Sequence, residues 1–195
     1  MRLRTGLSAF IGTFIVVLMV AVVPARAQDR TAFAALRENG AVALMRHGDA
    51  PGGTGDPAGF KLGDCNTQRN LSPKGRLESE EMGRRLKAEH VKVGRILSSP
   101  WCRCMDTARL LGMGRVVVAR AFGDGTTFET NHAAFTAEAR NVIRRWKGPG
   151  ALFIVTHGVN IEALTGIKPD QGEVLVVKAE VGGKVREVGR IAAAQ

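Results

Sequence analysis

Two histidines in this chain follow apolar runs and are each followed directly by a glycine. His47 lies in "LMRHGDA", next to Arg46, and His157 lies in "FIVTHGVNIEALTG". Another polar side chain, Arg103, follows a third apolar stretch in "ILSSPWCRCMDTA". Arginine binds phosphate through two parallel hydrogen bonds, and a neutral imidazole can attack phosphorus and carry the phosphoryl group. These residue types together predict chemistry on a phosphate group.

The elements that must position these residues alternate between strands and helices. The apolar runs predict strands at 41–45, 95–97, 116–119, 152–155 and 174–177. Helical patterns follow Ser72-Pro73, Pro100 and His157-Gly158, and another spans 135–146. A hairpin turned by Gly182-Gly183 is expected near the end of the chain. Such alternation is typical of an α/β fold.

The three polar junctions are expected to meet in one pocket. Ligands of open α/β sheets bind at the carboxyl ends of the strands, where helix N-termini also favour anions. If the strands are parallel, Arg46, His47, Arg103 and His157 converge there. The strand would hold His47 rigidly, and Gly48 would let a ligand approach the backbone. The long loop at 49–70, rich in Gly, Asp and Pro, is expected to gate the substrate.

Four stretches in this order resemble the histidine phosphatase superfamily, which includes the cofactor-dependent phosphoglycerate mutases and the phosphohistidine phosphatases. They are "LMRHGDA", "NLSPKGRLESEEMGRRL", "ILSSPWCRCMDTA" and "FIVTHGVNIEALTG". The resemblance implies a phosphoglycerate mutase-like, three-layer α/β sandwich. Its mostly parallel central sheet has helices on both faces, and no metal or cofactor is implied. His47 is then the phosphorylated nucleophile, and Arg46, Arg103 and His157 complete the phosphate pocket.

The chain departs from the mutases at the proton donor. The expected glutamate beside a tyrosine and glycines is missing, and the chain has no tyrosine. In its place stands "ARAFGDGTTFET", where Asp124 or Glu129 could supply the acid. Members of the family often have glutamine-alanine where this chain has Glu78-Ser79. We expect that pair on the surface of its helix.

The first 27 residues have the layout of a secretory signal peptide. Arg2 and Arg4 precede an apolar run, and Ala25-Arg26-Ala27 is a small-x-small site. Cleavage after Ala27 would leave a single histidine phosphatase domain at 28–195, periplasmic or secreted. An uncleaved membrane anchor is the alternative. Size and export narrow the likeness to small exported members related to lipopolysaccharide core heptose phosphate phosphatases.

The formal net charge of +10 favours anionic partners. These include a phosphorylated small molecule, a glycolipid phosphate and, peripherally, an anionic membrane surface. Nucleic acid is not expected, because no DNA- or RNA-binding motif is present. The leading hypothesis is a metal-independent phosphatase of the histidine acid phosphatase type. The alternatives are a catalytically weak anion-binding envelope protein and a phosphomutase.

Three cysteines permit one disulfide in an exported protein. Cys102 and Cys104 flank Arg103, each about 100° away around the helix axis. Cys104 lies on the side that packs on the sheet, and Cys102 lies nearer the rim crossed by the loop of Cys65. We predict a Cys65–Cys102 disulfide and a buried, reduced Cys104. The alternatives are three free thiols, or a zinc site of cysteines with the two histidines, for which ligand spacing is absent.

Overall fold

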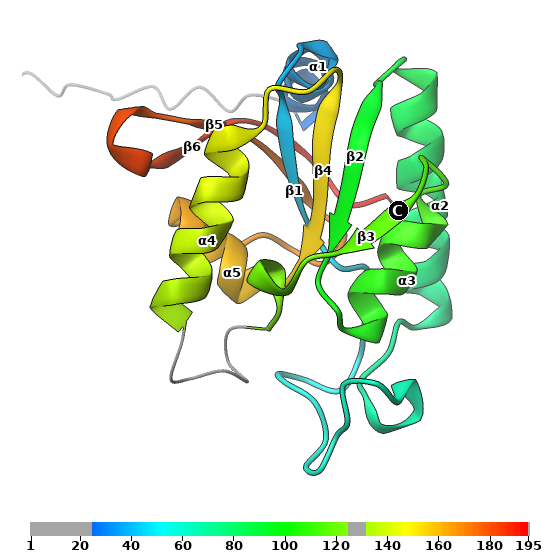
Figure 1. The fold of residues 1–195 in the computed structure, drawn as a ribbon. Helices are drawn as coiled ribbons and strands as arrows, with labels where there is room; N and C mark the ends of the chain where they lie inside the picture. The colour runs from blue at the N-terminus through cyan, green and yellow to red at the C-terminus, as the bar shows by residue number, and fades with distance from the viewer. Residues whose placement is uncertain (1–24, 125–131, 195) are drawn as a thin grey trace, which may run out of the picture.

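The computed structural model describes residues 25–124 and 132–194, which form an α/β sandwich (Figure 1). Its strands are β1 (Val42–Arg46), β2 (Val93–Ser98), β3 (Val116–Val118), β4 (Ala151–Thr156), β5 (Val174–Ala179) and β6 (Val185–Ile191). Its helices are α1 (Ala25–Arg37), α2 (Pro73–Ala88), α3 (Cys102–Leu110), α4 (His132–Arg145) and α5 (Gly158–Thr165). Short 3-10 turns are η1 (Cys65–Thr67), η2 (Arg120–Phe122) and η3 (Val181–Gly183). The predicted strands and helices are confirmed, and η3 turns the expected hairpin.

The strands form one mixed sheet in the order β3-β2-β4-β1-β5-β6. The four strands from β3 to β1 are parallel, whereas β5 is antiparallel to β1 and β6 is antiparallel to β5. The prediction of a mostly parallel sheet is therefore correct. Because β1, β2 and β4 run in the same direction, their carboxyl ends meet at one edge of the sheet.

The sheet is buried on both faces, and this explains the continuous apolar runs in the sequence. Ala43 and Met45 of β1 point into a core formed with α1, α2 and α3. Val42 and Leu44 point to the opposite face, into a core formed with α4, α5 and η2. The two helical layers lie on either side of the strands in Figure 1, which confirms the three-layer sandwich.

The helix α1 was not predicted from the sequence. Ala32, Phe33 and Leu36 are buried on its inner face, at the three- and four-residue spacing of a helix. The helix begins at Ala25, so the predicted cleavage after Ala27 falls in its first turn. The preceding part of the predicted signal peptide lies outside the described residues. Within the described ranges, no helix is long and apolar enough to cross a membrane.

The expectation that Glu78-Ser79 lies on the helix surface is wrong. Glu78 is 8% exposed and Ser79 is fully buried. Glu78 Oε2 accepts a hydrogen bond from the Asp49 backbone N–H (3.4 Å), and Ser79 Oγ donates to Gly75 O (2.6 Å). This face of α2 packs under the segment that follows β1, because Gly75 lets the Asp49 backbone approach the helix without a clash.

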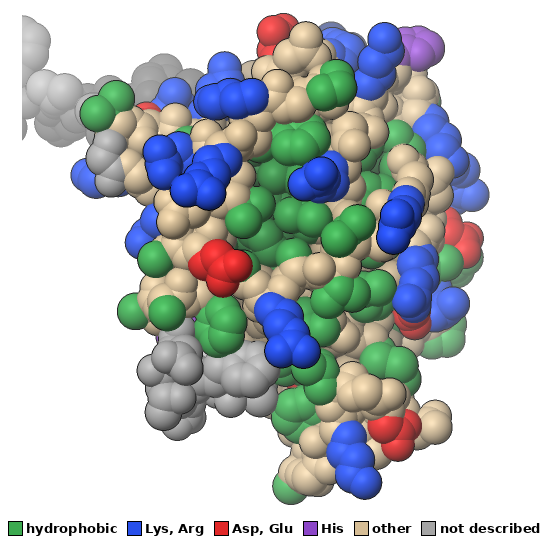
Figure 2. All heavy atoms as spheres, viewed as in Figure 1, with side chains coloured by type: hydrophobic (Ala, Val, Ile, Leu, Met, Phe, Trp, Pro, Cys, Tyr) green, Lys and Arg blue, Asp and Glu red, His purple; other side chains and the backbone are tan. Residues whose placement is uncertain are grey.

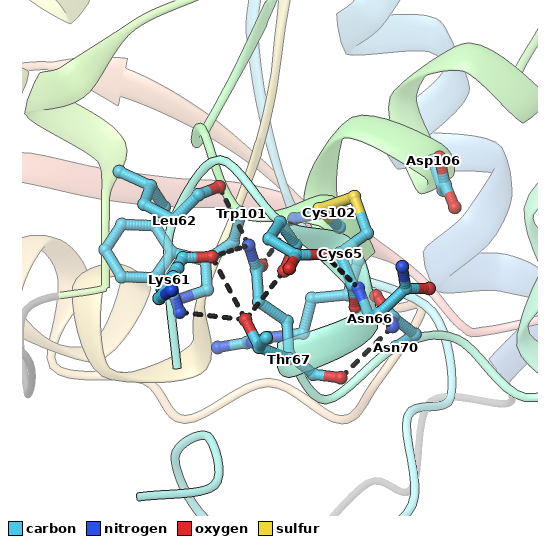
Figure 3. Close-up of a disulfide and its surroundings, with 12 residues drawn as sticks. Lys61, Leu62, Cys65, Asn66, Thr67, Asn70, Trp101, Cys102 and Asp106 are labelled. Carbon is cyan, nitrogen blue, oxygen red and sulfur yellow. Dashed lines mark hydrogen bonds between the residues drawn. A yellow bond between two sulfur atoms is a disulfide. The ribbon is translucent and has the colours of Figure 1, made fainter. Parts of the chain in front are cut away.

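The long loop after β1 is joined to the start of α3. A disulfide links Cys65 to Cys102, as predicted, with the Cα atoms 5.7 Å apart (Figure 3). Cys104 is free and buried, also as predicted. The cross-link closes a segment of 37 residues, for which the loss of chain entropy predicts roughly 3–4 kcal/mol of stabilisation. The loop is thereby held against the carboxyl edge of the sheet.

Candidate active site

The polar junctions of β1, β2 and β4 meet at the carboxyl edge of the sheet, as the sequence predicts. The junctions of β1 and β4 line a cavity of about 160 Å³, whereas Arg103, from the junction after β2, does not line it. Its walls are formed by Arg46, His47, Gly53, Thr54, Gly55, Arg69, Asp124, His157, Gly158, Val159 and Lys168. The long loop therefore supplies one wall of the cavity, and the strand ends supply the other.

His47 is held by its backbone and by one ring nitrogen. Its N–H continues the sheet by donating to Thr156 O (3.0 Å). Its ring Nδ1 lies 2.9 Å from Gly48 O. A carbonyl oxygen can only accept, so Nδ1 carries the proton in a neutral ring and Nε2 keeps its lone pair. His47 is thus in the tautomer that a nucleophile attacking through Nε2 requires.

The surroundings of His47 keep the ring neutral. Burial lowers its pKa well below the ordinary value of 6.5, and the neighbouring His157 and Arg103 lower it further. The hydrogen bond to Gly48 opposes the shift but does not cancel it. Gly48 is itself fixed, because its N–H donates to Thr107 Oγ1 (3.0 Å) on α3. A neutral imidazole on a rigid backbone is therefore available at the cavity.

Arg46 is held by a backbone carbonyl. Its Nη1 donates to Pro169 O (2.9 Å), and its Nε is buried without a hydrogen-bond partner among the described residues. The guanidinium packs on Gly158, where a Cβ would lie 3.3 Å from Nε. Glycine at the first position of α5 therefore makes room for the arginine. The charge of Arg46 faces the cavity, and over 25–124 and 132–194 no carboxylate is hydrogen-bonded to it, although Asp170 is near enough to act on its charge.

Arg69 is a second cation of the cavity that the sequence analysis missed. Its Nε donates to Gly55 O (2.8 Å), and its Nη1 donates to Ala50 O. These bonds join the two ends of the loop wall without neutralising the guanidinium. Arg69 stands three residues before the α2 cap at Ser72. Nothing in a polar loop distinguishes such an arginine from a solvated one before the loop is folded.

Arg103 lies behind the cavity wall. It is fully buried, and its Nη1 binds both carboxylate oxygens of Asp56 (2.8 and 3.0 Å). Its Nη2 donates to Asp124 Oδ2 (2.8 Å) and to His157 Nδ1 (3.3 Å). Its Nε is buried without a partner among the described residues. Two carboxylates therefore compensate Arg103, in contrast to Arg46 and Arg69.

His157 lies between the two halves of the site. Burial lowers its pKa well below 6.5, and the nearby arginines lower it further, with Arg103 the largest of them. Since Arg103 donates to Nδ1, the neutral ring carries its proton on Nε2, which lies 2.8 Å from Ser99 Oγ. Its ring meets the edges of His47 and Trp101, with centroids 5.6 and 5.4 Å away. These contacts fix the orientation of the His157 ring at the cavity wall.

Of the two predicted proton donors, Asp124 and Glu129, only Asp124 is among the described residues. Asp124 lines the cavity and is bonded to Arg103, with His157 Nδ1 at 3.5 Å from its Oδ2. Glu129 lies outside the described residues. Asp124 is therefore the predicted acid that the structure brings to His47 and His157.

The cysteines are not available as the metal ligands that the zinc hypothesis needs. Cys65 and Cys102 are consumed by their disulfide. Cys104 Sγ lies 3.6 Å from His157 Nε2, but burial raises the pKa of this thiol to about 12. Zinc binds the thiolate, so Cys104 is poorly suited to it. Over 25–124 and 132–194, no group of three His, Cys, Asp or Glu side chains could hold a metal ion.

Comparison with a family model covers the stretches that contain His47 and Arg103 but not the one that contains His157. A family model described as "Histidine phosphatase superfamily (branch 1)" matches residues 42–124. No curated protein matches the chain. The match to the family model ends at Asp124, the residue that closes the cavity wall.

Several solved structures share the fold. The protein histidine phosphatase SixA, complexed with tungstate, is 21% identical with a TM-score of 0.51, over 78% of this chain and 96% of its own. A mycobacterial glucosyl-3-phosphoglycerate phosphatase is 16% identical with a TM-score of 0.54, over 78% and 99%. A phosphoserine phosphatase from Entamoeba histolytica is 14% identical with a TM-score of 0.55, over 77% and 95%. At these identities the similarity shows the common α/β fold.

The two neutral histidines predict that acid destabilises the protein. Their pKa values are lowered on folding, so the unfolded chain binds protons first as the pH falls below about 6.5. The free energy of unfolding should then fall by up to about 1.4 kcal/mol per pH unit for each histidine, and be flat for them above pH ~7.5. Urea unfolding at pH 7.5 and pH 5.5 measures this difference.

Two variants identify the source of the slope. Replacing the buried ring in His157→Gln should reduce the loss of stability between these pH values. The exposed His90, which has a left-handed backbone (φ 56°), supplies the control His90→Asn, and its slope should equal that of the wild type. Equal pH slopes in all three proteins would contradict the assignment of His157 as a neutral buried group.

Proposed function

We propose that this chain is an exported, metal-independent phosphatase of the histidine phosphatase superfamily, which hydrolyses a phosphomonoester through a phosphohistidine on His47. The observation that carries the proposal is the Nδ1 contact of His47 with Gly48 O (2.9 Å). It leaves the Nε2 lone pair of a neutral imidazole at a cavity lined by arginines. Nucleophile and cations are the parts that phosphoryl transfer to histidine needs.

The reaction has two steps. The His47 Nε2 lone pair attacks phosphorus in line, the N–P bond forms and the ester P–O bond breaks. Asp124, in its protonated form, supplies a proton to the leaving oxygen, with Glu129 as the alternative donor. The carboxylate that this step leaves on Asp124 is paired with Arg103. Water then attacks phosphorus and gives a proton back to the donor carboxylate, the N–P bond breaks, and inorganic phosphate leaves with His47 neutral again. His157 lies beside His47 in the cavity wall, with the ring centroids 5.6 Å apart.

The charges around the cavity favour a phosphate dianion. Arg46 and Arg69 are held by carbonyl oxygens, which orient a guanidinium without neutralising it. Each keeps an Nη2 to which no acceptor is bonded among the described residues, so each can donate to a phosphoryl oxygen. The charge of Arg103 is compensated by Asp56 and Asp124. Arg103 therefore influences the site through its hydrogen bond to His157. Arg46 and Arg69 thus supply the positive charge that the phosphate meets directly.

The size of the cavity limits what it can enclose. Small-molecule sites usually measure about 300–1,000 Å³, whereas this cavity measures about 160 Å³. It suits a phosphoryl group, with the leaving group passing out beside the exposed Thr54 and Lys168. A terminal phosphate on a small molecule or on a glycolipid fits this description.

The proposed export and the basic surface together suggest where the substrate is found. The signal-like segment suggests a periplasmic or secreted enzyme. Lysine and arginine side chains are spread over the face in Figure 2, consistent with the net charge of +10. Such a surface suits peripheral contact with an anionic membrane, where a glycolipid phosphate of the lipopolysaccharide core would be found. The narrower likeness to heptose phosphate phosphatases belongs to this proposal.

The nucleophile is tested by removing it. His47→Ala should reduce hydrolysis of p-nitrophenyl phosphate at least ~10³-fold, because no covalent intermediate can form. The wild type, quenched in turnover, should carry an acid-labile phosphate on the peptide containing His47. His90→Asn is the matched control and should keep full activity. An active His47→Ala protein would refute the mechanism, and an inactive but phosphate-binding wild type would favour the anion-binding alternative.

Arg69 is tested against a matched arginine. Arg69→Ala should lower kcat/KM by about 10²-fold, since a partly buried guanidinium stabilises the charge on the phosphoryl oxygens in the transition state by a few kcal/mol. Arg69→Lys should recover only part, because lysine lacks the planar fork. The exposed Arg76, which pairs with Asp106 on the surface, gives the control Arg76→Ala with unchanged kinetics. Wild-type kinetics in Arg69→Ala would remove Arg69 from the site.

The acid is tested with two leaving groups. Asp124→Asn should slow hydrolysis of an alkyl phosphate at least ~10-fold more than that of p-nitrophenyl phosphate. The p-nitrophenolate anion is stable and needs little protonation, whereas an alkoxide needs a donor. The ratio of the two kcat values measures this directly. Equal losses on both substrates would assign the donor elsewhere, and Glu129→Gln would be compared next.

A further inference from the structure

We infer that Asp56 is a positioning residue for the reaction, which holds Arg103, Trp101 and Arg69 in place around the two histidines. The inference rests on the proposed phosphatase function. The side chain of Asp56 is 1% exposed, although Gly53 and Thr54 in the same loop are exposed. A loop on the surface thus sends one carboxylate inward. It does not line the cavity, so it acts through its partners.

Four hydrogen bonds satisfy this carboxylate. Arg103 Nη1 donates to both oxygens, at 2.8 and 3.0 Å. The Trp101 indole Nε1–H donates to Oδ2 (2.9 Å), and the backbone N–H of Arg69 donates to Oδ1 (2.9 Å). Every partner is a donor, so the site requires a group that only accepts. An ionised aspartate meets this requirement, whereas an asparagine amide would place N–H groups against N–H groups.

Each partner leads to a different part of the active site. Arg103 continues through its Nη2 to His157 Nδ1 (3.3 Å) and Asp124. The indole of Trp101 is fully buried and meets the His157 ring edge-on, at 82°. The backbone of Arg69 carries the guanidinium that lines the cavity. One carboxylate therefore sets the orientation of His157 from two directions and fixes the segment that bears Arg69.

The charge of Asp56 is as important as its shape. Arg103 is fully buried, and a buried cation needs compensation. With Asp56 in place, Arg103 is shared between two carboxylates on opposite ends of its guanidinium. Without Asp56, Nη1 would keep only the long hydrogen bond to Arg69 O (3.5 Å) among the described residues, and Asp124 would be the remaining carboxylate on Arg103. Asp124 would then compensate Arg103 alone, and the stronger demand for its ionised form would oppose its proposed role as proton donor.

The rest of the loop is built to deliver this carboxylate. The Cys65–Cys102 disulfide ties the loop to the start of α3, beside Trp101 (Figure 3). Gln68 adds a polar link, because its Oε1 accepts from the Cys102 N–H (3.0 Å) and its Nε2 donates to Leu62 O (2.8 Å). Asp56 and the disulfide thus fasten opposite parts of the loop to the same short helix and its N-cap. This explains how a glycine-rich loop can hold a group in a fixed position.

The test compares Asp56→Asn with Asp64→Asn in the same loop. Asp64 is the matched control, because its carboxylate caps η1 by accepting from the Asn66 N–H (3.1 Å) and does not reach the cavity. The substrate is p-nitrophenyl phosphate, and the inhibitors are inorganic phosphate and vanadate, which mimics the five-coordinate transition state. Asp56→Asn should lower kcat ~10- to 100-fold with KM changed less than ~3-fold, because positioning is realised in the transition state.

The inhibitors separate positioning from a loss of folding. Vanadate Ki should rise at least ~10-fold in Asp56→Asn while phosphate Ki changes less than ~3-fold, and Asp64→Asn should match the wild type in both. A merely structural role would lower stability and leave both constants of the folded protein unchanged. Tighter phosphate binding in Asp56→Asn would overturn the inference, because Asp56 would then be competing with the ligand for Arg103.

A second variant covers the case in which Asp56→Asn does not fold. Trp101→Phe keeps the ring edge on His157 and removes only the indole donor to Asp56. It should lower kcat and weaken vanadate in the same direction, by about 3- to 10-fold. Wild-type values in Trp101→Phe would overturn the inference in that case. If the wild type itself does not hydrolyse the substrate, the proposed function fails first, and the two failures are thus distinguished.

Discussion

The site depends on one buried cation. Arg103 is fully buried at the start of α3, and its guanidinium is shared between Asp56 from the long loop and Asp124 from the end of η2. Removing one partner from such a cluster leaves an uncompensated charge in a low-dielectric interior, which typically costs about 3–5 kcal/mol. The long loop after β1, helix α3 and the segment after β3 must therefore lie together around Arg103. The carboxyl edge of the sheet supplies that meeting point.

The strand ends of the site could be predicted because their signals are local. A strand covered on both faces must be apolar throughout, so "VALM" and "ALFIV" identify β1 and β4 before any contact is known. An arginine or histidine directly after such a run must lie at the edge of the sheet. Parallel pairing of β1 with β4 and of β4 with β2 then brings His47, His157 and Arg103 together. The cysteine pairing followed from the same geometry, with the helical angle between Cys102 and Cys104.

The parts contributed by the loop could not be predicted in this way. Asp56 and Arg69 lie in a polar segment where acids and bases are ordinarily solvated, and no periodicity indicates which of them turns inward. Glu78-Ser79 was misjudged for a related reason. Its polarity indicates solvent, but the neighbouring Gly75 lets the Asp49 backbone cover that face of α2, so Glu78 is buried as a hydrogen-bond acceptor. Which polar side chains are buried by loop contacts depends on the tertiary structure and is not visible in the local sequence.

The arginines of the site have two different roles: one stabilises the protein structure, and the others are available to bind the ligand. Carboxylates bind Arg103, so its charge is compensated inside the protein, and its guanidinium holds His157 through a hydrogen bond. Carbonyl oxygens hold Arg46 and Arg69, and a carbonyl orients a guanidinium while leaving its net charge intact. A dianion entering the cavity therefore meets two oriented guanidinium groups, neither hydrogen-bonded to a carboxylate of the described residues, beside two neutral imidazoles. Burial and the neighbouring arginines, Arg69 among them, lower the pKa of both histidines, so the charge that attracts the phosphate also helps to preserve the lone pair that would attack it.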